Sequence, residues 1–207
     1  MSERIVAAGR RIEEDSLAII DREAGAHGFG PRAWPIVRRV IHATADFEFQ
    51  RTLELHRDAV DAGIAALRAR APIVADVRMI AAGLPRLDVR CLIGDADVAQ
   101  AAREGGTTRA AAAMRKAARL GILDGGVVAI GNAPTALAEL QRLVEAGAAR
   151  PALVVAVPVG FVGAAESKEA ARSLPVPWIV ARGRKGGTPV AVAALNALAI
   201  LAAEDDA

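Results

Sequence analysis

The chain has 207 residues, 53% of them hydrophobic, which is enough to build one domain (residues 1–207) around a full core and excludes a disordered protein. Its formal net charge is only +2 and 3% of its residues are aromatic, so neither a strong positive field nor base-stacking platforms favour nucleic-acid binding. No apolar stretch reaches the roughly 18 residues of a membrane span, and the first residues lack the apolar core of a signal peptide, so we expect a soluble protein that does not associate with a membrane.

The first third of the sequence is predicted to be helical. Apolar residues recur at helical spacing among charged ones up to Gly25, where a glycine-rich segment ends the first helix. A second helix is predicted over residues 33–43, with Val37 and Val40 on its apolar stripe, and a third over residues 53–70.

From residue 73 onward, short apolar runs alternate with helical segments. The predicted strands cover residues 73–75, 88–93, 126–130, 152–157 and 178–181. The clearest helix between them covers residues 107–120, with Thr107 or Thr108 as its N-cap. Because strands that alternate with helices are typical of a parallel sheet with right-handed crossovers, the sequence predicts an α/β protein with a five-stranded, mostly parallel sheet.

Three of these strands run directly into loops rich in glycine and polar groups. The loops are GNAPT (131–135), PVGFVGAAESK (158–168) and RGRKGGTP (182–189). The carboxyl ends of parallel strands meet at one rim of the sheet, where open α/β sheets bind their ligands. Glycines let backbone N–H groups approach a ligand, and helices that start at Ala133 and Thr188 favour anions. We therefore expect the three loops to form one pocket.

The side chains around these loops indicate the chemistry of the ligand. The cationic ones are Arg109, Lys168, Arg182, Arg184 and Lys185. A ligand with several carboxylates would satisfy them, at roughly 1.5–3 kcal/mol for each charge-assisted hydrogen bond, whereas the simpler explanation is a solvated basic patch. An apolar wall would come from Met79, Ile80, Phe161 and Val162. The pattern predicts a large, partly apolar ligand with several negative charges.

Among the three histidines, His42 is the best candidate to transfer a proton. It stands at the end of an apolar helix, and a free imidazole titrates near pH ~6.5. His27 in a glycine-rich turn and His56 in a charged segment are more simply surface residues. The alternative for His42 is a helix-end histidine bonded to a backbone carbonyl.

Motifs for several other chemistries are missing. His42 has no second histidine or cysteine at metal-ligand spacing, and the nearby carboxylates Asp46 and Glu48 do not complete a convincing metal site. The nucleophile elbow G-x-S-x-G, the dinucleotide motif G-x-G-x-x-G and the P-loop are all absent. Cys91 is the only cysteine, so an intrachain disulfide is impossible and a reducing, cytoplasmic setting is expected. We predict no metal and no cofactor.

Four segments, in chain order, resemble one known family. They are VIHATADFEF (40–49), GNAPTAL (131–137), PVGFVGAAESKEA (158–170) and GRKGGTP (183–189). They are similar to the precorrin-8X methylmutase family, also called precorrin isomerase, and the third segment is the most specific. The similarity extends from IEEDSLAII (12–20) to ALNALA (194–199) and so covers nearly the whole chain.

The resemblance implies a three-layer α/β/α sandwich, a cytoplasmic homodimer and a role in cobalamin biosynthesis. The family moves a methyl group from C-11 to C-12 of precorrin-8X, giving hydrogenobyrinate by a [1,5]-sigmatropic shift that protonation of the ring assists. A related branch acts on the cobalt-bearing macrocycle, and both branches stay open for this chain. The substrate is an apolar ring with acetate and propionate arms, in agreement with the ligand expected from the residues. Handover of the product to the next cobalamin-pathway enzyme is a further expected partnership.

The resemblance also assigns roles to residues. The catalytic histidine of the family matches His42, and Ser16 and Arg39 match positions similar to its substrate-binding residues. Arg39 precedes His42 by one helical turn, so both are expected to face the same ligand. Further expected substrate contacts within the matching segments are Thr44, Gly160 and Phe161. The residues expected to line the edge of the macrocycle are Arg109, Asn132, Thr135, Lys168, Arg182 and Arg184.

Two other functions stay open on the sequence. A doubly wound enzyme acting on nucleotides or sugar phosphates would use the glycine loops as an anion cradle, although the phosphate motif is missing. A tetrapyrrole-binding carrier would hold the product for the next enzyme without converting substrate.

Overall fold

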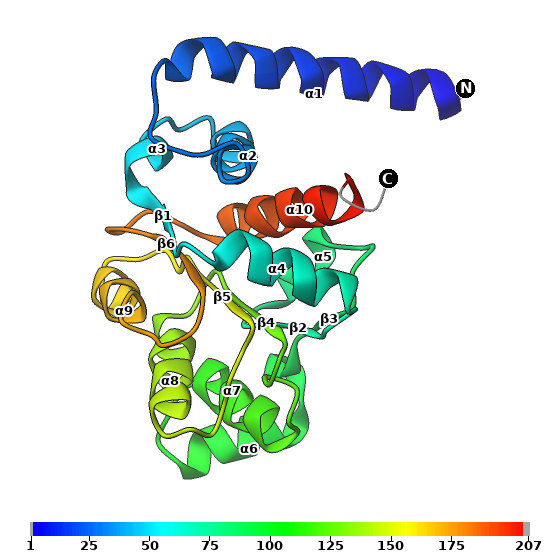
Figure 1. Cartoon of the computed structure of the whole chain (residues 1–207). Helices are drawn as coiled ribbons and strands as arrows, with labels where there is room; N and C mark the ends of the chain where they lie inside the picture. Colours follow the sequence, from blue (N-terminus) through cyan, green and yellow to red (C-terminus); the bar gives the residue numbers. More distant parts are fainter. Residues whose placement is uncertain (1, 205–207) are drawn as a thin grey trace.

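The computed structural model describes residues 2–204 and has a six-stranded sheet at its centre (Figure 1). The strands are β1 (Leu53–Leu55), β2 (Ile73–Ala75), β3 (Val89–Arg90), β4 (Val127–Ile130), β5 (Leu153–Ala156) and β6 (Trp178–Ala181). They are ordered β1-β6-β5-β4-β2-β3, and all neighbours are parallel except β1, which pairs antiparallel with β6. The predicted mostly parallel sheet is confirmed, but it has six strands and not the five expected, because β1 was not foreseen.

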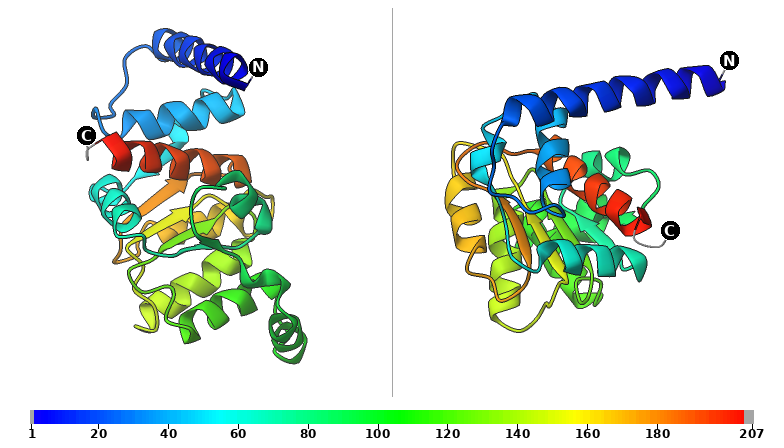
Figure 2. Two further views of the ribbon diagram at one scale, coloured as in Figure 1. Left: turned by 90° about the vertical axis from the view of Figure 1, so that its right-hand side faces the viewer. Right: turned by 45° about the horizontal axis from the view of Figure 1, so that its top comes forward.

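Helices cover both faces of the sheet, as the predicted three-layer sandwich requires (Figure 1). One side carries α2 (Trp34–Thr44), α4 (Ala59–Arg68), α5 (Arg78–Gly83) and α10 (Thr188–Glu204). The other side carries α7 (Arg109–Arg119), α8 (Pro134–Glu145) and α9 (Ala164–Ala171), with α6 (Ala96–Glu104) packed on α7. The longest helix, α1 (Ser2–Ala24), lies outside α2, furthest from the sheet, as Figure 2 shows from two further sides.

The central strands explain why the sheet has two apolar faces. Every residue of β4 and β5 is fully buried, which is typical of parallel strands covered on both sides. Side chains alternate between the faces, so Val127 and Ala129 belong to the core under α10, while Val128 and Ile130 belong to the core under α7 and α8. This rigid centre fixes the ends of β4, β5 and β6, from which the three predicted loops start.

The prediction of a helix over residues 53–70 is wrong in its first part. Residues 53–55 form β1, which pairs with β6 in the register Leu53↔Ala181, and the helix α4 begins only at Ala59. The short helix α3 (Phe49–Thr52) precedes this strand. The predicted strand over residues 88–93 is shorter than expected, because after β3 the chain turns into a 3-10 helix at Leu92–Gly94.

The other predicted helices agree closely with the structure. The second predicted helix is α2, and the helix predicted over residues 107–120 is α7. Thr108 is the N-cap of α7, because its side chain accepts the backbone N–H of Ala111 at 3.2 Å. Within residues 2–204, none of the helices combines the length and the apolarity that crossing a membrane requires.

Candidate active site

His42 lies in the last turn of α2. This helix starts with Pro35 near its N-terminus, where the missing N–H costs nothing, and buries the stripe that includes Ile36 and Val40. It ends where Ala45 adopts a left-handed conformation (φ 52°) and donates its N–H to the Ile41 carbonyl. His42 is half-buried, and the sharp end of the helix fixes the backbone that carries it.

A cavity of about 350 Å³ opens beside His42, between α1 and the end of α2. Its lining includes Ser16, Ile19 and Glu23 from α1 and Ile41, His42 and Phe47 from the other side. The fold therefore brings together Ser16 and His42, which are distant in sequence but were expected to share one ligand. The Ser16 hydroxyl donates to the Ile12 carbonyl at 2.6 Å within α1, so its oxygen keeps the capacity to accept a hydrogen bond.

Arg39 lies along the same seam between the two helices but lines a different, smaller cavity of about 110 Å³. Its guanidinium binds the Glu13 carboxylate of α1 at 2.5 Å. Arg39 and His42 therefore occupy neighbouring cavities within this chain. Thr44, at the end of α2, donates its hydroxyl proton to the Val40 carbonyl at 2.8 Å.

The loops after β5 and β6 lie against each other at the rim of the sheet. Gly160 donates its N–H to the Arg184 carbonyl at 3.1 Å, and the Arg184 guanidinium lies 5.3 Å from the centre of the Phe161 ring. Phe161 is 83% exposed, and its neighbour Val162 is equally open. These residues form a lip that is both cationic and apolar. The predicted apolar wall is wrong for Ile80, which is fully buried in the core.

The backbone of the GNAPT loop, which was expected to bind an anionic ligand, instead binds a side chain of the protein. The N–H groups of Gly131, Asn132 and Ala133 all donate to the Asp76 carboxylate, at 3.0, 2.9 and 2.6 Å. Asp76 is fully buried, and this burial raises its pKa although the three N–H groups favour the charged form. These donors are therefore already occupied by the chain itself and are not free for a ligand.

The side chains of Asn132 and Thr135 remain exposed on the same loop. Thr135 shares a 2.7 Å hydrogen bond with Thr108, which holds the starts of α7 and α8 together. Arg109, the next residue, is exposed and lines a separate cavity of about 490 Å³ beside α6. Within this chain these residues lie on the side of the sheet opposite α2.

Arg182 and Lys168 are already bonded within the protein. The Arg182 guanidinium pairs with Glu54 at 2.9 Å, on β1. Lys168 is fully buried under the loop that follows β6, and its ammonium donates to the Lys185 carbonyl at 2.6 Å. Burial lowers the pKa of Lys168 to about 8. Lys168 therefore supports the rim from beneath.

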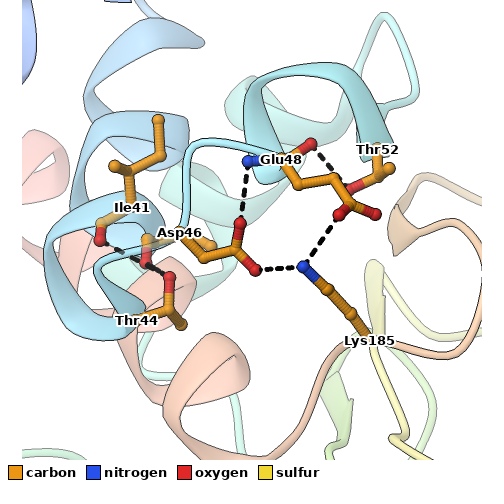
Figure 3. Close-up of polar contacts among 7 residues, drawn as sticks. Ile41, Thr44, Asp46, Glu48, Thr52 and Lys185 are labelled. Carbon is orange, nitrogen blue, oxygen red and sulfur yellow. Dashed lines mark hydrogen bonds and ion pairs between the residues drawn. The ribbon is translucent and has the colours of Figure 1, made fainter. Parts of the chain in front are cut away.

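A cluster near His42 was not foreseen from the sequence. The Lys185 ammonium binds Asp46 at 2.6 Å and Glu48 at 2.7 Å, just beyond the end of α2 (Figure 3). Hydrogen bonding to these carboxylates raises the pKa of Lys185, and the Lys185 bond lowers that of Asp46. Asp46 and Lys185 are 139 residues apart, so no local sequence pattern indicates their contact. Asp76 differs, because it directly follows a buried strand, and a polar residue at that position is a sequence signal for a functional or structural role.

The chemistry available beside His42 is proton transfer. An imidazole side chain can act as a general acid or a general base, and Ser16 and Glu23 line the same cavity as His42.

Comparison with known proteins gives one consistent result. Residues 11–201 match the family model described as precorrin-8X methylmutase. The cobalt-precorrin-8 methylmutase of Leptospira interrogans is 45% identical over 97% of both chains, and the precorrin-8X methylmutase of Pseudomonas aeruginosa is 45% identical over 92% of this chain and 95% of its own. A crystal structure of the precorrin-8X methylmutase of Thermus thermophilus superposes with a TM-score of 0.88 at 49% identity, covering 95% of this chain and 97% of that one.

Proposed function

The chain belongs to the precorrin-8X methylmutase family and is a methyl-shift isomerase of cobalamin biosynthesis, and from this premise we propose that His42 is its proton-transfer residue. The substrate is a precorrin-8-type macrocycle, and the product is hydrogenobyrinate or its cobalt equivalent. The observation that carries the role of His42 is that it shares one cavity with Ser16, a residue of another helix.

The reaction requires little catalytic equipment. In a [1,5]-sigmatropic shift the bond from C-11 to the methyl carbon breaks while the bond to C-12 forms, and no atom is gained or lost. His42 lends a proton to the conjugated ring, which biases the ring toward the tautomer that favours migration, and takes a proton back afterwards. Such general acid assistance is typically worth about 10²–10⁴-fold in rate.

The carboxylate arms of the substrate explain the charged rim. Arg184 and Phe161 offer a cation and an apolar ring side by side, which suits a macrocycle that is apolar in its plane and acidic at its edge. We propose that the other residues predicted from the sequence also contact the substrate, and that Lys168 acts indirectly, through the loop whose carbonyl it binds. Those residues are Ser16, Arg39, Thr44, Arg109, Asn132, Thr135, Gly160 and Arg182.

The size of the His42 cavity supports a homodimer. At about 350 Å³ it is near the lower end of the roughly 300–1,000 Å³ found for small-molecule sites, and a macrocycle with many arms needs more room and more walls. On α1, Ile12 is 68% exposed and Ile19 is 43% exposed, so this helix offers apolar surface to a second copy. We propose that the second subunit completes the site.

Two further parts of the proposal concern the cell. A cytoplasmic setting agrees with a lone cysteine, Cys91, that has no partner for a disulfide. The exposed lip at Phe161 suits handover of the product to the next enzyme of the pathway.

The test is the variant His42→Ala, compared with His56→Ala. His42→Ala should lower turnover by about 10²–10⁴-fold while the dissociation constant of the product, measured by absorbance titration, stays unchanged. His56, whose Nδ1 accepts the Asp58 N–H in the connection between β1 and α4, should be replaceable without loss of turnover. If His42→Ala rearranged substrate at the parental rate, His42 would have only a structural role. If the parental protein bound product but converted no substrate, it would be a carrier.

A further inference from the structure

We propose that Lys185 is a positioning residue for the methyl shift, because it clamps the loop after β6 to the chain that ends the helix carrying His42. This inference rests on the proposed function of His42. Lys185 acts at its two ends, since its ammonium and its backbone carbonyl are both bound by side chains from other parts of the fold.

The ammonium end holds the turn that follows α2 (Figure 3). It contacts Asp46 at 2.6 Å and Glu48 at 2.7 Å, and Asp46 also accepts the N–H of Glu48 at 2.9 Å. The hydroxyl of Thr52 donates to the Glu48 carbonyl at 3.0 Å, which ties the same turn to α3. This turn begins at Ala45, three residues after His42, so its position sets where the last turn of α2 lies.

The carbonyl end is fixed to the body of the sheet. The buried Lys168 ammonium of α9 donates to the Lys185 carbonyl at 2.6 Å. Two residues on, Gly187 donates its N–H to the Val157 carbonyl at 2.7 Å. Gly186 lies so close to the end of β5 that an added Cβ would stand 2.3 Å from the Val157 oxygen. The loop is therefore held against the rigid centre of the protein.

The two ends together connect the centre of the sheet to His42. The path runs from α9 through the backbone of Lys185 to its side chain, and from there to Asp46 and the end of α2. Exposed ion pairs contribute little to overall stability, and the Lys185 side chain is 48% exposed. Catalysis is far more sensitive to placement, since a misplacement of about 1 Å can lower the rate by roughly 10²-fold. The bond of Lys185 therefore matters more for turnover than for folding.

The experiment compares Lys185→Met with Lys185→Arg in the full-length protein. Lys185→Met should lower kcat on the order of 10–100-fold, with KM and product affinity within about twofold of the parent and the melting temperature nearly unchanged. Lys185→Arg should restore most of kcat, because a guanidinium can bind both carboxylates.

Lys116→Met is the matched control. Lys116 also bridges two carboxylates, Asp95 and Asp97, both at 2.7 Å, but it lies on α7, on the far side of the sheet from α2. The same loss of a doubly paired lysine there should leave kcat unchanged. An equal fall of kcat in Lys116→Met would mean that Lys185→Met acts only through general loosening, which overturns the proposal.

A double variant separates this inference from the proposed role of His42. If Lys185 acts by placing His42, then Lys185→Met should cause no further loss in a His42→Ala background. A further loss there, a parental kcat in Lys185→Met, or a loss expressed mainly in KM and product affinity would each overturn the positioning role. A parental rate in His42→Ala alone would instead refute the proposed function of His42.

Discussion

The two longest helices of the described chain, α1 and α10, differ sharply in how they are held. Over its 17 residues α10 buries nine, and Leu195 and Leu198 are completely covered in the core above the sheet. In α1, which has 23 residues, Ile20 is the single buried side chain within residues 8–24. The difference shows that the scaffold is secured by burial, whereas the helix that contributes Ser16 to the His42 cavity is secured mainly at its surface.

Polar contacts take the place of burial along α1. Asp21 binds Trp34 at 2.8 Å and Arg38 at 2.7 Å, and Glu13 binds Arg39. Such partly exposed pairs are typically worth about 0–1 kcal/mol each, much less than a buried leucine. A helix held in this way is secured less firmly than one held by burial, so α1 is expected to be the less rigid wall of the His42 cavity.

The largest expected effect is on the scaffold side of this comparison. Leu198→Ala should lower the free energy of unfolding by about 2–5 kcal/mol, because it removes fully buried methyl groups and leaves a cavity between α10 and the sheet. Urea unfolding followed by circular dichroism measures it. A loss below about 1 kcal/mol would mean that the side chains around Leu198 relax to fill the space, and that α10 is not held more rigidly than α1.

An intermediate effect tests the buried charge within the scaffold. The pKa of Lys168 is lowered to about 8 in the folded protein, below its usual value of 10.5, so between these pH values the unfolded chain binds more protons and stability rises with pH. From pH 7.5 to 9.5 the parent should therefore gain about 1–2 kcal/mol over Lys168→Met.

Thermal melts of both proteins at the two pH values give this difference. Lys116→Met should show no such trend, because its two carboxylates raise the pKa of Lys116 and keep it charged throughout this range. Parallel pH curves for the parent and Lys168→Met would contradict the burial of a charged amine at this position.

The smallest effect is expected on α1. Ile12→Ala should change the unfolding free energy of the single chain by no more than about 0.5 kcal/mol, because the side chain is 68% exposed. Urea unfolding at several protein concentrations measures it. A larger loss that grows with protein concentration would show that a second copy covers Ile12. The difference in burial between α1 and α10 would then hold only for the isolated subunit.

The sheet-centred half of the fold is predictable from the sequence because its signals are local. The apolar runs that form β4 and β5 end at a glycine and a proline, the run that forms β6 ends at Arg182 just before a glycine, and α7 starts at a threonine that caps it. Strand β1 is not predictable in this way. It has three residues, lies between two helices, and becomes a strand only by pairing with β6, more than a hundred residues later.

The candidate site shows the same division. Side chains at the ends of strands were placed at the rim because strand ends are visible in the sequence, and Arg184 and Phe161 do meet there. The burial of Lys168 and the bond of Lys185 to Asp46 depend on long-range packing that no spacing reveals. For His42, the residues alone left a structural histidine open, and the resemblance to a family favoured catalysis.

The carboxylate of Asp76 has a consequence for ligand choice. By accepting the three N–H groups at the start of α8, it places a negative charge where many α/β proteins receive a phosphate. A nucleotide phosphate that approached the GNAPT loop would meet this carboxylate, and the backbone N–H groups of Gly131, Asn132 and Ala133 would not be available to it. One buried side chain therefore closes the backbone at the start of α8 to the anion that this position receives in many other folds of the same class.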